Sequence, residues 1–192
     1  MKKLFILLSL LFISACGSTA EIDSNMSRDI VDLSAKNQHG EQVDVKEEMK
    51  GDYWVANMIF TSCTTVCPPM TSNMSRLQDQ IEQEGLDIRL ASFSIDPSTD
   101  DVKTLKQFAD KYNPDYGNWS FYTGYPFEEI KELSIKSFQS PVQKLENSDQ
   151  YAHATGFFLV TPEGKVIKNY EGTNSEAMET IMSDLKKIKG AS

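Results

Sequence analysis

Cysteine and histidine are scarce in this sequence, with three cysteines and two histidines among 192 residues. So few of these residues restrict any metal or redox site to a handful of side chains. Basic residues form no cluster, and the formal net charge is -9. Because nucleic acid is bound by clustered Lys and Arg that displace counterions, this composition argues against nucleic acid as a partner.

Repeats, low-complexity tracts and long hydrophobic runs are also missing. The apolar run near the start, LFILLSLLFI, is too short to span a bilayer but has the length of a signal-peptide core. It ends in ISAC, where the small residues Ser14 and Ala15 before Cys16 resemble a bacterial lipobox. That resemblance implies a signal peptide over residues 1–15, a lipid on Cys16, and a protein anchored at the extracytoplasmic face of the cell membrane. The alternative is an ordinary secretory signal that leaves Cys16 as a chance thiol.

The remainder of the chain has the size of one globular domain. Residues 16–27 are small and polar, as expected of a tether between a lipid anchor and a domain over residues 28–192. A hydrophobic content of 40% and a charged content of 24% are ordinary for a globular protein. Cleavage after residue 15 would remove two lysines and no acid, so the net charge would fall from -9 to -11.

Strand and helix patterns alternate along this domain. We predict, in order, a hairpin within residues 32–45, a strand over 53–60, a helix from the prolines to about 84, a strand over 86–95, a helix over 102–112, a strand over 119–123, a helix over 127–138, a hairpin of 156–161 with 165–170, and a last helix around 178–188. This order is that of a thioredoxin-like α/β sandwich with an N-terminal β-hairpin. Residues 140–153 are predicted to be a long irregular loop, and such loops are usually functional or mobile.

The stretch TSCTTVCPP, residues 61–69, places Cys63 and Cys67 between a buried strand and a helix. Proline suits the first turn of a helix and disfavours helical backbone at the residue before it. Cys67 is therefore expected just ahead of the helix, with Pro68 opening it. At the positive end of the helix dipole, both thiols are expected to have a lowered pKa and to favour the thiolate.

Three uses of this cysteine pair remain open. A structural disulfide would close so short a loop that it would constrain the unfolded chain little. A thioredoxin-type redox pair normally has two intervening residues, and this pair has three, which still permits a disulfide. A metal site is the third use, because two thiolates suit Cu(I) or Zn and an added imidazole suits Cu(II) as well. His39 is expected to be an exposed turn residue, so His153, just before the strand at 156–161, is the candidate third ligand.

Taken together, these motifs resemble the Sco family, also called SenC or PrrC, of membrane-anchored copper proteins that assist assembly of cytochrome c oxidase. The resemblance rests on FTSCTTVCPPM, FSIDPSTDD, FYTGY, and His153 shortly before GFFLVTPEGK. It implies a thioredoxin-like fold, with Cys63, Cys67 and His153 as ligands of copper in both the Cu(I) and the Cu(II) state.

The resemblance also places Asp96 near the site, behind the ligands or in contact with a partner. Because DPST is a good cap sequence, the alternative for Asp96 is a turn and helix-cap carboxylate. Two features depart from the family pattern. Residues 64–66 are more neutral than the acid-containing versions common in the family, and the hydrophilic loop before His153 suggests that this histidine reaches the site only when metal orders the loop.

The leading hypothesis is a copper-binding assembly factor that delivers copper to the binuclear copper centre of cytochrome c oxidase, or reduces the cysteines of that centre. Its partners would be the copper-bearing oxidase subunit and other copper carriers or thiol reductants. An enzyme is the alternative: a thiol-disulfide oxidoreductase or thioredoxin-like peroxidase, serving redox signalling, with Cys63 as nucleophile. Thioredoxins carry a cis-proline before the strand facing their active site, and QYAHAT, residues 150–155, has none. A lipoprotein interaction module with a passive disulfide is the third possibility.

Overall fold

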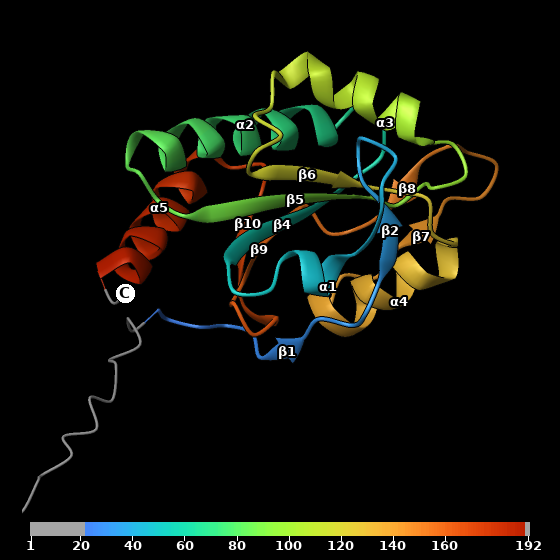
Figure 1. Cartoon of the computed structure of the whole chain (residues 1–192). Helices are drawn as coiled ribbons and strands as arrows, with labels where there is room; N and C mark the ends of the chain where they lie inside the picture. Colours follow the sequence, from blue (N-terminus) through green and yellow to red (C-terminus); the bar gives the residue numbers. More distant parts are fainter. Residues whose placement is uncertain (1–21, 191–192) are drawn as a thin grey trace, which may run out of the picture.

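The computed structural model describes residues 22–190, which form a six-stranded sheet with helices packed on both of its faces (Figure 1). The predicted signal peptide, Cys16 and the first part of the tether lie outside the described residues. None of the helices within 22–190 is long and apolar enough to cross a membrane.

The sheet has the strand order β1-β10-β9-β4-β5-β6. Its strands are β1 (Arg28–Asp29), β4 (Tyr53–Ile59), β5 (Ile88–Ser94), β6 (Trp119–Tyr122), β9 (Gly156–Val160) and β10 (Lys165–Glu171). β4, β5 and β6 run parallel, β9 is antiparallel to β4, and β10 is antiparallel to β9. The near-continuous burial of β4 and β5 explains their apolar sequences, because strands of a parallel sheet are covered on both faces.

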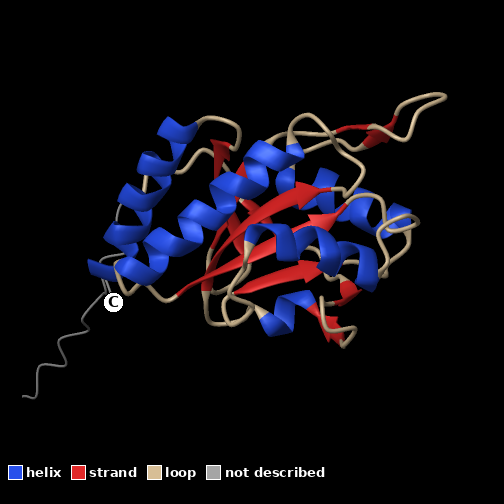
Figure 2. Cartoon of the chain, turned by 90° about the horizontal axis from the view of Figure 1, so that it is seen from above, coloured by secondary structure: helices blue, strands red, loops and turns tan. Residues whose placement is uncertain are grey.

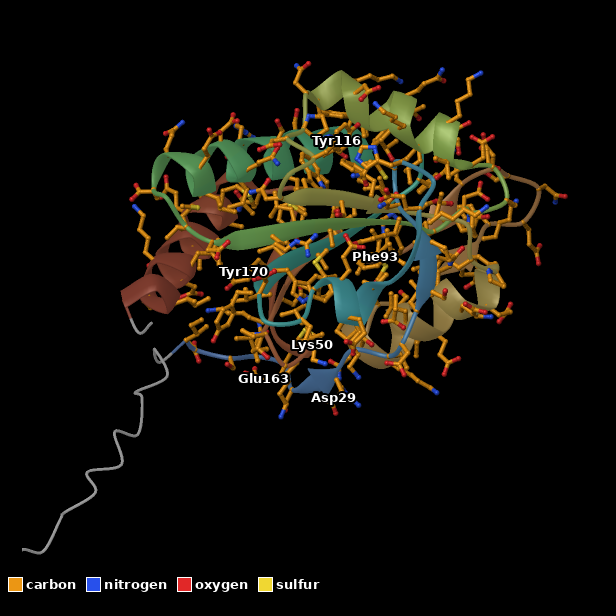
Figure 3. All side chains as sticks on the ribbon, in the orientation of Figure 1. Asp29, Lys50, Phe93, Tyr116, Glu163 and Tyr170 are labelled. Atoms are coloured by element: carbon orange, nitrogen blue, oxygen red, sulfur yellow. The ribbon has the colours of Figure 1, made fainter. Side chains whose placement is uncertain are left out.

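Helices cover the sheet from two sides, with α2 and α3 on one side and α1 and α4 on the other (Figure 1). Their bounds are α1 (Val45–Glu48), α2 (Cys67–Gln83), α3 (Val102–Ala109) with the 3-10 turn η1 (Asp110–Tyr112), α4 (Phe127–Phe138) and α5 (Ser175–Gly190). The predicted inner face of α2 is confirmed, since Met70, Met74, Leu77 and Ile81 are all buried. Phe93 of β5 lies in the middle of the domain (Figure 3), with its ring centroid 5.2 Å from that of Tyr122 and 6.2 Å from that of Phe138.

The predicted thioredoxin-like α/β sandwich and its N-terminal hairpin are confirmed. The hairpin consists of β2 (Ser34–Lys36) and β3 (Gln42–Asp44), and His39 lies exposed in its turn.

One prediction about the backbone is wrong. Residues 140–153 are not irregular throughout, because β7 (Gln143–Lys144) pairs with β8 (Tyr151–Ala152) in a hairpin that projects from the domain (Figure 2). Leu145 N donates to Gln150 O at 2.9 Å, and Asn147 adopts a positive φ of 54° in the turn. Two-residue strands of mostly polar residues lack the alternating apolar pattern by which strands are recognised.

Candidate metal and redox centre

Cys63 and Cys67 lie in the connection between the end of β4 and the start of α2. The helix begins at Cys67, one residue earlier than predicted, with Val66 as its N-cap. Cys63 is 5% exposed and Cys67 is fully buried, and within the described chain neither forms a disulfide. The amide of Cys67 donates to Cys63 Sγ at 3.4 Å, and Thr65 Oγ1 lies 3.9 Å from the same sulfur.

The two thiols differ in acidity. Burial alone would raise the pKa of Cys63, but hydrogen bonds from the Cys67 thiol and from the amides of residues 65–67 lower that pKa below its ordinary value. Burial raises the pKa of Cys67, and the hydrogen bond with Cys63 raises it further. The expectation that both pKa values are lowered is therefore wrong for Cys67, because a buried thiol that donates to its neighbour stays protonated. Cys63 is therefore the more acidic thiol of the pair.

His153 directly follows β8 and lies three residues before the start of β9. Its Nδ1 lies 2.8 Å from Ala154 O, and the carbonyl requires Nδ1–H as the donor. Burial lowers the pKa of His153, with the Ala154 hydrogen bond acting in the opposite direction, so the ring is neutral at pH 7. Nε2 then carries a lone pair, and this buried atom has no hydrogen-bond partner among the described residues. A neutral imidazole with one nitrogen held by a carbonyl and the other unpartnered is the form that binds a metal ion.

The structure does not bring the three predicted ligands together. Within residues 22–190, no group of three or more His, Cys, Asp or Glu side chains could hold a metal ion as it stands. His153 packs edge-on against Phe60, the last residue before the cysteine stretch, with ring centroids 5.8 Å apart. A site using all three side chains therefore requires the segment that carries His153 to shift toward the cysteines.

Two residues of the β7–β8 hairpin, Gln150 and Tyr151, contact the cysteine stretch and the residue before it. Gln150 Nε2 donates to Ser62 O at 3.3 Å. The Tyr151 ring lies with its centroid 5.4 Å from that of Phe60 and 5.9 Å from that of Phe127. Both contacts lie within three residues of His153, so they hold the histidine segment in its present position.

Asp96 lies in the turn after β5 and is 2% exposed. Burial alone would raise its pKa, but hydrogen bonds from Ser98, Thr99 and Tyr151 lower it. The helix-cap alternative is wrong, because α3 is capped by Asp101, whose carboxylate accepts from Thr104 N at 2.7 Å. Asp96 is thus a turn carboxylate that contacts the histidine segment through Tyr151.

Sequence patterns do not single out a second acid at this end of the sheet, Asp100. It is fully buried, and its carboxylate accepts hydrogen bonds from Thr61 and Ser94. DPSTDD has the composition of a solvated turn, which conceals the fact that Asp100 is fully buried. Its only sequence signal is its place in the turn that follows the second strand of a parallel pair, where functional side chains gather.

The SCO1/SenC family model matches residues 28–190. The chain belongs to the SCO1/SenC family. The SCO1 protein homolog of Bacillus subtilis (strain 168) is 43% identical over 176 residues, which cover 92% of this chain and 90% of that protein. This Sco chain is thus similar to a curated Sco protein over nearly its full length.

Solved Sco structures show the same fold. A SCO1/SenC family lipoprotein from Bacillus anthracis str. Ames has a TM-score of 0.81 at 40% identity, covering 86% of this chain and 99% of that one. BsSco, a member of the Sco family of cytochrome c oxidase assembly proteins in which a disulfide switch was identified, has a TM-score of 0.78 at 42% identity, covering 87% and 96%. The thioredoxin-like fold class is therefore that of the Sco family.

Proposed function

We propose that this Sco protein binds one copper ion through Cys63, Cys67 and His153, and that it serves the assembly of the copper centre of cytochrome c oxidase. The observation that carries the proposal is the unpartnered, buried Nε2 of a neutral His153, at the same end of the sheet as Cys63, whose pKa is lowered by hydrogen bonds from residues 65–67. Two sulfur donors suit Cu(I), and the imidazole adds a donor that suits Cu(II). Membership of the Sco family supports the same ligand set.

The residues contribute in a defined order. Cys63, the thiol with the lowered pKa, is the first donor. Cys67 gives up its proton on binding, so metal uptake releases a proton and strengthens as pH rises. His153 joins last, since the contacts of Gln150 with Ser62 and of Tyr151 with Asp96 must loosen before its segment can shift.

The cysteine pair is compatible with two roles in oxidase assembly: copper donor and thiol reductant. As a reductant, the Cys63 thiolate attacks a disulfide of the oxidase subunit to form a mixed disulfide, and Cys67, once deprotonated, displaces the target's second thiol. Two electrons pass to the target, and Cys63 and Cys67 end as a disulfide that can no longer hold copper. Other copper carriers and thiol reductants would be the partners that restore the metal-loaded or reduced protein.

The place of action proposed is the extracytoplasmic face of the cell membrane, with a lipid on Cys16. The ISAC sequence supports this, as does the description of the similar Bacillus anthracis protein as a lipoprotein. Cys16→Ser should move the protein from the membrane fraction to the soluble fraction. Retention of the variant in the membrane would reject the lipid anchor at this residue.

The copper proposal is tested by titrating the reduced protein with Cu(II) while recording absorption and electron paramagnetic resonance. One copper per chain and a thiolate-to-Cu(II) charge-transfer band are expected. His153→Ala should lose the wild-type Cu(II) spectrum, whereas His39→Ala, at the exposed turn of β2 and β3, should keep it. An unchanged spectrum in His153→Ala would remove this histidine from the ligand set.

The second candidate is a thiol-disulfide oxidoreductase, favoured by the unequal acidity of Cys63 and Cys67. An attacking thiolate beside a protonated, buried resolving thiol is the arrangement such enzymes use. Turnover of insulin disulfides by the copper-free protein discriminates between the oxidoreductase and the copper-binding assembly factor. Turnover comparable to that of a dedicated reductase would make the enzyme the better assignment.

A further inference from the structure

We propose that Asp100 is a positioning residue that holds the start of the cysteine stretch, and so sets the geometry with which Cys63 and Cys67 bind metal. This inference rests on the copper function proposed above. Asp100 lies in the turn that follows β5, where the amides of Thr99 and Asp100 both donate to Asp96 O, at 3.0 and 2.9 Å. The turn directs the Asp100 side chain inward, where it is fully buried.

Both carboxylate oxygens of Asp100 are engaged. Oδ1 accepts from Thr61 Oγ1 at 2.5 Å, while Oδ2 accepts from Thr61 N at 3.1 Å and from Ser94 Oγ at 2.6 Å. Thr61 is thus held by its main chain and its side chain together. It stands two residues before Cys63, whose own amide donates to Phe60 O at 3.2 Å. The conformation from Phe60 to Cys63 therefore depends on the Asp100 carboxylate.

Burying the Asp100 carboxylate is energetically unfavourable. None of the ion pairs formed within residues 22–190 includes Asp100, and an isolated buried carboxylate is unfavourable unless hydrogen bonds compensate it. Burial raises the pKa of Asp100, while the hydrogen bonds from Ser94 and Thr61 act against that rise. Packing alone would be served as well by a neutral side chain of this size. What a carboxylate adds is an acceptor that can take three donors from two strand ends at once.

The same residue connects the ends of three parallel strands. Thr61 follows β4, Ser94 ends β5, and Thr123, which follows β6, donates through Oγ1 to Asp100 O at 2.5 Å. A connection anchored on several rigid strands is held in one geometry before metal arrives. Preorganised ligands bind more tightly because little ordering remains to be done on binding.

Asp100→Asn in the full-length, reduced protein is the direct test. The amide keeps the size of the side chain but directs NH2 toward at least one of the donors from Thr61 or Ser94. Cu(II) binding should weaken by roughly 10- to 100-fold, as is usual for partners behind metal ligands. The charge-transfer band and the paramagnetic resonance spectrum should shift, while the stoichiometry stays at one copper per chain.

The matched control is the adjacent exposed acid, in Asp101→Ala. This variant loses the cap bond to Thr104 N and should lower the melting temperature, yet it should leave copper affinity and spectra unchanged. If Asp100→Asn fails to fold, Thr61→Val tests the same contact, because it removes only the Oγ1 bond and keeps the volume. Thr61→Ser, which retains both donors, should restore wild-type binding.

Wild-type affinity and spectra in both Asp100→Asn and Thr61→Val would overturn the proposal, and so would a lowered melting temperature with an unchanged spectrum. A second readout needs no copper. The rate at which iodoacetamide alkylates Cys63 in the metal-free protein should change several-fold in Asp100→Asn and not in Asp101→Ala. If the wild type binds no copper, the copper function fails, and the alkylation rates alone decide the positioning role.

Discussion

The amide of Cys67 donates to the sulfur of Cys63 at 3.4 Å, and this contact contributes to the different acidity of the two thiols. The donated hydrogen bonds stabilise negative charge on Cys63, whereas full burial keeps Cys67 protonated. In the absence of metal, Cys63 is therefore expected to be the more reactive thiol of the pair.

Iodoacetamide should alkylate Cys63 well before Cys67 at pH 7. The pKa of Cys63 lies below the ordinary thiol value and that of Cys67 above it, so the difference should persist across the neutral range. Mass spectrometry of Cys67→Ser and Cys63→Ser measures each thiol separately. In urea the two rates should converge, and equal rates in the folded protein would contradict the assignment.

Gly172→Ala should destabilise the protein by about 1–3 kcal/mol, because an added Cβ would collide with the carbonyl of Thr155. Gly172 N donates to Thr155 O at 2.7 Å, and Asn73 of α2 donates to Gly172 O at 2.7 Å. The substitution should therefore also displace the His153 segment and weaken Cu(II) binding. Urea unfolding and copper titration measure the two effects.

Gly117→Ala is the control for that substitution, since its Cβ would meet only the Asp115 side chain. A change within about 0.5 kcal/mol is expected there. Equal losses of stability in both variants would refute the close approach at Gly172.

Asp184→Asn should lower stability by about 1–3 kcal/mol at pH 7 through lost charge-assisted hydrogen bonds. Asp184 is nearly buried, with Lys168 and Lys187 each 2.8 Å away. Burial alone would raise its pKa, but hydrogen bonds from Lys168, Lys187 and Tyr170 lower it. A folded-state pKa below the unfolded one gives stability that is present above about pH 4 and is lost as pH falls through the folded pKa.

The difference between Asp184→Asn and wild type in urea unfolding should accordingly shrink as pH falls from 7 to 3. Asp79→Asn, at an exposed aspartate of α2, should change stability by less than about 0.5 kcal/mol at either pH. A pH-independent loss in Asp184→Asn would mean that its charge is not responsible.

Tyr151→Phe should loosen the β7–β8 hairpin, because it removes the hydroxyl that interacts with the Asp96 carboxylate while keeping the ring contacts with Phe60 and Phe127. Hydrogen exchange of residues 143–152 should be faster in the variant, with β5 unchanged as the internal control. Unchanged exchange in the hairpin would show that other contacts, such as that of Gln150 with Ser62, hold it without the tyrosine.

Much of the fold follows from local patterns. The apolar run of β4, the four-three-four spacing of the buried residues of α2, and the turn signals around β9 and β10 each lie within one segment, so they predict the element order and the thioredoxin-like sandwich. The β7–β8 hairpin was not predicted, because its pairing depends on backbone hydrogen bonds and on the packing of Tyr151 against distant elements. Neither of these produces a periodic pattern in the sequence.

For the site, the sequence by itself determined which side chains can act: two thiols at a helix start and one histidine before β9. The tertiary structure decided their environments: the pKa of Cys63 is lowered and that of Cys67 is raised, His153 packs against Phe60, and the buried Asp100 is hydrogen-bonded to Thr61. The reason is physical. Residue type and spacing set what chemistry is available, whereas protonation and position depend on burial, on the local backbone conformation around Cys63, and on hydrogen bonds between segments tens of residues apart.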